Sequence, residues 1–165
     1  MARAKSIKRE IVVILHNIRS LHNVGSIFRT ADAAGAKKIY LCGITPKPID
    51  RLGALRKQFT KVSLGAEKYI SWDYARDTAS VIKKLKQEGW KVFAVEQSKK
   101  SIPYYESVIM RHGSKIALVF GNEVRGLPPS ILRLADKILE IPMLGRKESL
   151  NVSVAAGIVL FSLRK

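Results

Sequence analysis

Residues 115–127 read KIALVFGNEVRGL, and this stretch decides the fold prediction. Its first part, Lys115–Phe120, is almost wholly apolar and shows no alternation with polar side chains, which is typical of a strand buried on both faces. Strands of that kind occur in parallel sheets that helices cover on each side. The second part, Gly121–Leu127, is polar and contains two glycines, so the strand is expected to end in a loop.

Similar apolar runs elsewhere in the chain predict further strands, and amphipathic segments between them predict helices. The expected strands are Glu10–Leu15, Lys38–Cys42, Lys91–Glu96 and Lys137–Ile141. The first expected helix begins at Val24, after Asn23 as N-cap, and stops at Gly35. Three further helices are expected from Trp72 to Gly89, from Pro128 to about Ala135 and from Asn151 to Leu163. Residues 50–66 are ambiguous. We therefore predict an α/β fold, a mostly parallel sheet with helices on both faces. A single domain is expected over residues 1–165, beginning with a short basic segment of about residues 1–10.

Ligands of such sheets bind in the loops beyond the carboxyl ends of the strands. Here these loops are His16–Asn23, Gly43–Pro48, Gln97–Ile102, Gly121–Leu127 and Pro142–Ser149. Three of them are rich in Asn, Arg, Glu, Gly and Ser, so the functional site is expected among them.

The charge of the chain points to a polyanionic partner. It has 30 Lys and Arg residues against 13 Asp and Glu residues, a net charge of +17 and a pI near 10.3. Basic side chains that neutralise phosphates release counterions, which favours RNA or DNA as the partner. The alternative is a basic surface that serves only solubility. A membrane partner is disfavoured because no apolar stretch approaches the ~20 residues of a span and no long basic amphipathic helix is present.

The remaining composition favours a cytoplasmic protein. No apolar signal-peptide core follows the basic start of the chain, and the single cysteine, Cys42, cannot form an internal disulfide.

Several enzyme signatures are missing from the sequence. The histidines His16, His22 and His112 show no metal-ligand spacing with Cys42, so no metal is expected. Leu127-Pro128 stands where a P-loop needs Lys-Ser/Thr, and no dinucleotide fingerprint or nucleophile elbow occurs.

Three polar segments remain, and they carry a family resemblance. They are residues 17–32 (NIRSLHNVGSIFRTAD), 118–127 (LVFGNEVRGL) and 141–155 (IPMLGRKESLNVSVA). In this order they resemble the three motifs of the SpoU/TrmH-type branch of the SPOUT superfamily of RNA methyltransferases, and the likeness extends from Ile11 to Leu163. The resemblance implies S-adenosylmethionine as methyl donor and a ribose 2′-hydroxyl of tRNA or rRNA as acceptor. It also implies a C-terminal deep trefoil knot and an obligate homodimer.

The resemblance assigns catalytic roles to five residues. Arg29 matches the motif-one arginine beside the acceptor hydroxyl, and we interpret it as a fixed positive charge that stabilises the developing alkoxide. Asn23 matches the motif-one asparagine and Glu123 the motif-two acid, for which a partner such as Arg29 or a backbone amide is expected. Ser149 and Asn151 match the motif-three pair that positions substrate or donor, and Asn151 can also cap the last helix.

The donor and the RNA are assigned to the same loops. By resemblance, main-chain groups of Gly121, Ile141, Met143 and Leu150 bind S-adenosylmethionine, with Gly121 and Gly145 permitting close approach. For Ile141 and Met143, simple core packing is the alternative. The candidate RNA-phosphate contacts are Arg125, Arg146 and Lys147, for which the alternative is a solvated loop charge.

The last helix supports the dimer from the residues themselves. Both faces of this helix are apolar, which predicts that the helix is buried on all sides. One face carries Val152, Ala156 and Val159, and the other carries Val154, Ile158 and Phe161. A terminal helix of so small a domain is most easily covered by a second subunit. Two alternatives to the methyltransferase are an RNA-binding module that has lost catalysis and a nucleotide enzyme of another kind. The sequence leaves open which nucleotide is modified.

Overall fold

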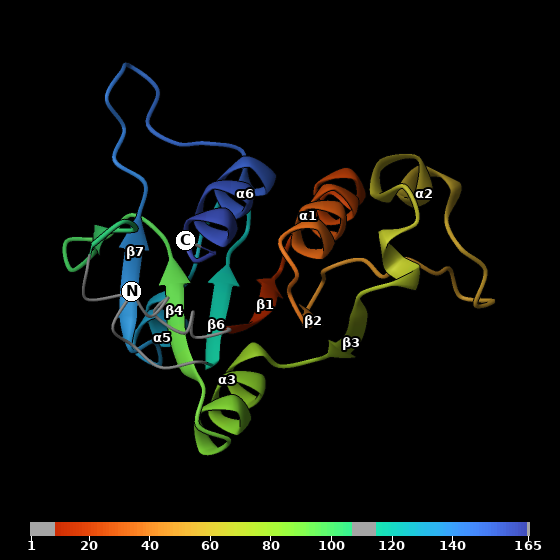
Figure 1. Ribbon diagram of the computed structural model, residues 1–165, viewed down its shortest axis with the longest axis horizontal. Helices are drawn as coiled ribbons and strands as arrows, with labels where there is room; N and C mark the ends of the chain where they lie inside the picture. The colour runs from red at the N-terminus through yellow and green to blue at the C-terminus, as the bar shows by residue number, and fades with distance from the viewer. Residues whose placement is uncertain (1–8, 107–114, 165) are drawn as a thin grey trace, which may run out of the picture.

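The computed structural model describes residues 9–106 and 115–164, and its centre is one seven-stranded sheet (Figure 1). The strands are β1 (Glu10–His16), β2 (Lys38–Cys42), β3 (Ser71–Ala75), β4 (Lys91–Val95), β5 (Ile102–Pro103), β6 (Lys115–Phe120) and β7 (Lys137–Glu140). They lie in the order β3-β2-β1-β6-β4-β7-β5, and all neighbouring strands pair in parallel. The helices are α1 (Leu21–Ala33), α2 (Lys57–Ser63), α3 (Thr78–Gln87), α5 (Pro129–Leu132) and α6 (Val152–Ser162), with a 3-10 turn η1 (Ala66–Lys68). The predicted α/β class with helices on both faces is confirmed.

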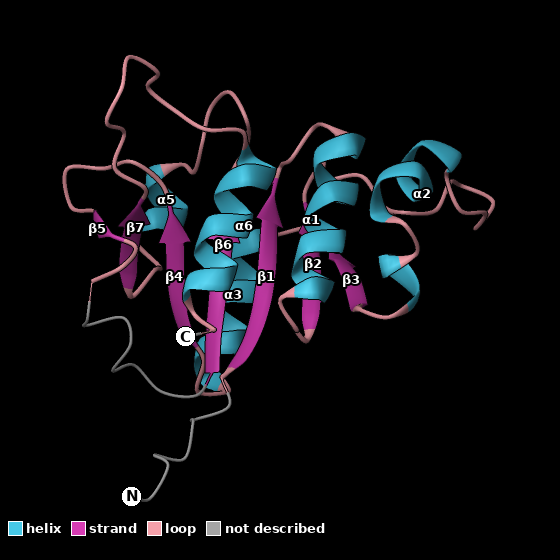
Figure 2. Ribbon diagram, turned by 45° about the horizontal axis from the view of Figure 1, so that its top comes forward, coloured by secondary structure: helices cyan, strands magenta, loops and turns pink. Residues whose placement is uncertain are grey.

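Alternation along β1 explains the two helical layers. Ile11, Val13 and Leu15 point to the face that α1, α2 and α6 cover, whereas Val12 and Ile14 point to the face of α3 and α5. Figure 2 shows α1 and α6 side by side in front of the sheet and α3 behind it.

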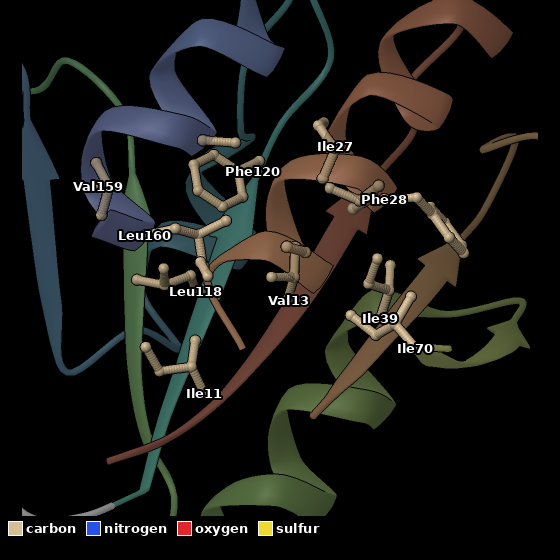
Figure 3. Close-up of a cluster of buried hydrophobic side chains, with 14 of the residues drawn as sticks. Ile11, Val13, Ile27, Phe28, Ile39, Ile70, Leu118, Phe120, Val159 and Leu160 are labelled. Atoms are coloured by element: carbon tan, nitrogen blue, oxygen red, sulfur yellow. The ribbon is translucent and has the colours of Figure 1, made fainter. Parts of the chain in front are cut away.

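The larger of the two cores lies between α1, α6 and the central strands (Figure 3). Its largest side chains, Phe28, Phe59, Phe93 and Phe120, are almost fully buried. Phe28 of α1 meets Phe59 of α2 edge to face at 5.1 Å, which fixes α2 against α1. Burial of one such side chain contributes about 1.5–3 kcal/mol. These contacts hold α1 in place against the sheet and α2.

The helix predicted from Trp72 is wrong at its start. Residues Ser71–Ala75 form the edge strand β3, which pairs with β2 through Ile39 and Trp72, and the helix begins at Thr78 after its N-cap Asp77. Aromatic residues favour strands, and the ion pair between Lys38 and Asp73 joins the two strands. Propensity and pairing therefore outweigh the helical spacing of the alanines.

The other differences are smaller. Ser20, and not Asn23, caps α1, since its Oγ accepts a hydrogen bond from the Asn23 N–H at 3.1 Å. The predicted stop at Gly35 is confirmed by its φ of +68°, which favours glycine. The short strand β5 and the helix α2 were not predicted, because two residues and seven residues give too little periodicity.

Two predictions fall outside the part of the chain that the structure describes. They are most of the basic segment of residues 1–10 and His112. Within residues 9–106 and 115–164, no helix has the length and hydropathy that a membrane span requires.

Candidate active site

A cavity of about 480 Å³ lies at the carboxyl edge of the sheet, at the ends of β4, β6 and β7. Because these neighbouring strands are parallel, the loops that follow them meet at one edge. The volume is within the ~300–1,000 Å³ of small-molecule sites. The lining residues are Asn23, Val95, Glu96, Gln97, Phe120, Gly121, Asn122, Glu123, Val124, Gly126, Leu139, Glu140, Ile141, Met143, Ser149, Leu150, Asn151, Val152 and Ala155.

The lining of the cavity is acidic although the protein is strongly basic. Glu96, Glu123 and Glu140 belong to it, and among the described residues no Lys or Arg does. Carboxylates favour a ligand with positive charge. S-adenosylmethionine carries a sulfonium and an ammonium group, so both the volume and the charge of this cavity fit the donor that the resemblance implies.

Three side chains from distant parts of the sequence join in one hydrogen-bonded network. The Asn23 amide donates to Glu123 Oε1 at 3.1 Å, and the Asn151 amide donates to Asn23 Oδ1 at 3.1 Å. Asn151 Oδ1 also accepts from the Ser153 N–H at 2.8 Å, which caps α6 as predicted. Asn23 is 8% exposed, so its two contacts are largely shielded from water. One residue from each of the three predicted motifs therefore meets at the wall of the cavity.

The carboxylate of Glu123 is further held by the start of α1. It accepts hydrogen bonds from the Arg19 N–H at 3.0 Å and the Ser20 N–H at 3.1 Å. Of the two partners predicted for this acid, Arg29 or a backbone amide, the structure therefore shows backbone amides. Partial burial raises the pKa of Glu123, but the backbone N–H groups of Arg19, Ser20 and Glu123 itself and the Asn23 amide outweigh it. The net pKa lies below the ordinary value of 4.5.

We expect the acid stability of the protein to depend on Glu123. Because its folded-state pKa is lowered, the carboxylate stabilises the fold above its ordinary pKa of 4.5, and this contribution is lost as the pH falls through the folded-state pKa. The melting temperature of Glu123→Gln should lie below that of the wild type at about pH 7, and the two should converge as the pH falls through the lowered folded-state pKa of Glu123. Glu148→Gln, on an exposed loop, is the control. A Glu123→Gln curve parallel to the wild type would contradict the expectation.

Glycines and a glutamate bring the loop after β6 close to β4. A Cβ on Gly121 would lie 2.6 Å from the carbonyl carbon of Gly126 and 2.7 Å from Leu127 Cγ, so only glycine fits there. Glu96 Oε2 accepts from the Leu127 N–H at 2.9 Å. The close approach of the donor predicted at Gly121 and Gly145 stays a prediction, and a Cβ on Gly145 would have no atom of the described chain within 4 Å.

The loop between β7 and α6 projects from the body of the molecule (Figure 1) and is held at its far end by Gln97. The Gln97 side chain donates to the Glu148 carbonyl at 2.6 Å. This contact fixes the residues just before Ser149 and Asn151 against the end of β4. Glu96 and Gln97 thus attach both walls of the cavity to one strand end.

Most of the predicted site residues lie at this cavity. Asn23, Glu123, Ser149 and Asn151 line it together with the predicted donor-binding residues Gly121, Ile141, Met143 and Leu150. Four predicted residues do not line it, and all are exposed: Arg29, Arg125, Arg146 and Lys147. Arg29 follows Asn23 by six positions on α1, which separates them by about 9 Å along the axis and about 120° around it. Within one chain, Arg29 therefore faces away from the cavity.

The prediction missed Glu96, Gln97 and Asn122 as site residues. The loop that starts at Gln97 was among the expected ligand loops. Which loops lie beside it could not be predicted, because this depends on β4 lying between β6 and β7 in the sheet. Asn122 donates to the Asn17 carbonyl at 2.7 Å and so connects the loops after β6 and β1. Across the described residues, no group of three His, Cys, Asp or Glu side chains is arranged to hold a metal ion.

Comparison with known proteins identifies a matching family. The sequence model of the SpoU rRNA methylase family matches residues 10–161. The chain is 30% identical over 158 residues to a tRNA (guanosine(18)-2′-O)-methyltransferase of Aquifex aeolicus, a match that covers 96% of this chain and 70% of that protein.

Solved structures resemble the fold closely. The TrmH/SpoU tRNA modifying enzyme of A. aeolicus superposes with a TM-score of 0.80 at 30% identity, covering 95% of this chain and 76% of the other. The AdoMet-bound rRNA methyltransferase of Sinorhizobium meliloti gives a TM-score of 0.81 at 33% identity, covering 94% of this chain and 56% of the other. The sequence motifs, the parallel sheet and the family match over nearly the whole chain agree, and the chain belongs to the SpoU rRNA methylase family.

Proposed function

We propose that this chain is a methyltransferase that moves a methyl group from S-adenosylmethionine to a ribose 2′-hydroxyl of tRNA or rRNA. The observation that carries the proposal is the network of Asn23, Glu123 and Asn151 at the wall of an acidic cavity of about 480 Å³. The relatives named above act on tRNA and rRNA, and one neighbouring structure contains AdoMet.

The donor supplies an activated methyl group with a good leaving group, so the protein must align the acceptor and stabilise its charge. Main-chain groups of Gly121, Ile141 and Leu150 in the cavity wall would hold the donor, with Met143 beside them. Glu123 already accepts three hydrogen bonds from Arg19, Ser20 and Asn23, and its pKa is lowered, so it is a weak base. We therefore assign Glu123, Asn23 and Asn151 to positioning the loops, and Ser149 to contact with substrate or donor.

Arg29 stabilises the charge that develops on the ribose oxygen, and it does so in a homodimer. The helix α6 exposes Val154 and Phe161, each 50% exposed, whereas Val152 and Ala155 of its first turn line the cavity. A Cβ on Gly157 would lie 3.5 Å from the methyl group of Thr30, so the residue next to Arg29 lies where α1 meets α6. A second copy that covers the apolar side of α6 would bring Arg29 of one subunit towards the cavity of the other.

The dimer can be tested at Phe161. We expect Phe161→Glu to sediment as a monomer at micromolar concentration and to lose methyl transfer, because a charge on the contact face opposes burial. Tyr69→Glu is the control, since Tyr69 is 79% exposed and lies at η1. A wild-type chain that sediments as a monomer, or a monomeric Phe161→Glu with full activity, would contradict the proposal.

Further parts of the proposal rest on the family. The C-terminal segment from β6 to α6 is expected to form a trefoil knot around the cavity, which agrees with the convergence of the loops after β6 and β7. Arg125, Arg146 and Lys147 are exposed on those loops and would contact RNA phosphates. We propose that the protein acts in the cytoplasm, where RNA is the abundant polyanion. We further propose that residues 1–165 form one catalytic domain.

The activity is tested with methyl-labelled S-adenosylmethionine and total RNA. Alkaline hydrolysis needs a free 2′-hydroxyl, so methylated riboses should appear as labelled, alkali-resistant dinucleotides. Label found only in released bases would contradict the acceptor. An RNA-binding module without catalysis is the alternative, and it predicts that calorimetry detects RNA binding but no donor binding.

A further inference from the structure

The carboxyl edge of the sheet continues from the cavity towards β3 as one connected surface. The Asn122 amide donates to the Asn17 carbonyl at 2.7 Å, and Asn17 Oδ1 accepts from the Ile44 N–H at 3.0 Å. The Gly43 N–H donates to the Ala75 carbonyl at 3.1 Å. The loops after β6, β1, β2 and β3 are therefore tied in sequence, so side chains on this edge are held at fixed positions relative to the cavity.

Tyr74 is an exposed aromatic side chain that the edge holds in place. It stands near the end of β3, and its hydroxyl donates to the Gly43 carbonyl at 2.9 Å. The side chain is 45% exposed, and Lys47 Nζ lies over one face of the ring, 5.0 Å from its centroid. An aromatic ring that is fixed before binding loses little conformational entropy when a planar group stacks on it.

Three basic side chains stand in the loops after β1, β2 and β3. Arg19, Lys47 and Arg76 are exposed, and the guanidinium groups of Arg19 and Arg76 make no hydrogen bond or ion pair among the described residues. The acids nearby already have partners. Asp77 caps α3 through the Ala79 and Ser80 N–H groups, Asp73 pairs with Lys38, and Glu123 is bound to α1.

We propose that Tyr74 and Lys47, together with Arg76 just after β3 and Arg19 in the loop after β1, form a platform at the same edge of the sheet as the cavity, on which the RNA substrate stacks one unpaired base against the ring face opposite Lys47. The inference deepens the proposed function, on which it rests. An exposed ring with cations around it is the combination that binds single-stranded nucleic acid, because the ring stacks a base while the cations meet the adjoining phosphates. Bases in a duplex are already stacked on each other, so the platform selects loops and bulges.

The test compares binding of a labelled single-stranded oligoribonucleotide with binding of the same strand annealed to its complement. Tyr74→Leu keeps an apolar side chain of similar bulk but removes the ring. We expect it to weaken binding of the single strand by about tenfold, the effect of one base–aromatic stack, and to leave duplex binding unchanged. Tyr74→Phe keeps the ring and should bind like the wild type, which separates stacking from any effect of losing the hydroxyl contact.

A pair of lysine variants tests the charge of the platform. Lys47→Gln should reduce the slope of log affinity against log salt concentration for the single strand by about one, the release of one counterion. Lys84→Gln should leave this slope unchanged. Lys84 is also exposed but lies near the end of α3, towards the amino edge of the sheet.

Equal affinity of Tyr74→Leu and wild type for the single strand, or equal losses for both probes, would overturn the platform. Donor binding measured by calorimetry should be the same in all four variants. The two proposals can fail separately, because a wild-type chain that labels no ribose contradicts the enzyme, while the binding assay does not depend on methyl transfer.

Discussion

Arg29→Ala is expected to lower the rate of methyl transfer by about 100- to 1,000-fold, the cost of removing one charge that stabilises a developing oxyanion. Because Arg29 is assigned to the acceptor oxygen and does not line the donor cavity of its own chain, the affinity for S-adenosylmethionine should stay at the wild-type level. The side chain is exposed, so the free energy of unfolding should change by less than about 0.5 kcal/mol. Arg29→Lys should restore only part of the rate, because the ammonium group lacks the planar fork of the guanidinium.

Mixing two inactive variants shows which subunit uses this arginine. In equal mixtures of Arg29→Ala and Asn151→Ala, half of the dimers are mixed. If Arg29 serves the cavity of its partner, each mixed dimer keeps one intact site, and about a quarter of the wild-type rate returns. If Arg29 serves its own cavity, no intact site forms and no activity returns. A full wild-type rate in Arg29→Ala alone would contradict the catalytic role itself.

The central strands were predictable because each is buried on both faces and carries an uninterrupted apolar run. β1, β2, β4, β6 and β7 lie within a residue of their expected positions. The edge strand β3 was not predictable in this way, since exposed Asp73 and Tyr74 give it the mixed polarity of a surface segment. A local pattern of apolar residues indicates a buried strand, and few side chains of β3 are buried.

The site was predictable as a set of residues but not as an arrangement. The motifs identified Asn23, Glu123 and Asn151, which lie up to 128 positions apart and yet form consecutive hydrogen bonds. The sequence assigned Asn23 to a helix cap because only local contacts can be inferred from spacing. Glu96 carries no local signal, since its partner, the Leu127 N–H, is set by the order of β4 and β6 in the sheet.

Gly121→Ala is expected to lower the rate of methyl transfer by about 100-fold, since a displacement of about 1 Å at a reacting centre has that effect. The added Cβ would lie 2.6 Å from the carbonyl carbon and 2.8 Å from the carbonyl oxygen of Gly126, so backbone must move. The displaced segment carries Glu123, which holds Asn23 and the start of α1. Donor affinity should therefore fall as well, by at least about tenfold.

The matched control for this change is Gly145→Ala on the loop between β7 and α6. A Cβ there meets no atom within 4 Å, so we expect wild-type donor affinity and rate. Calorimetry with S-adenosylmethionine and a melting curve for each variant separate a local effect from unfolding. Overpacking of this kind costs about 1–3 kcal/mol, so Gly121→Ala should still fold at low temperature. Wild-type donor affinity in Gly121→Ala would show that the cavity beside it does not bind the donor, and the proposed chemistry would lose its location.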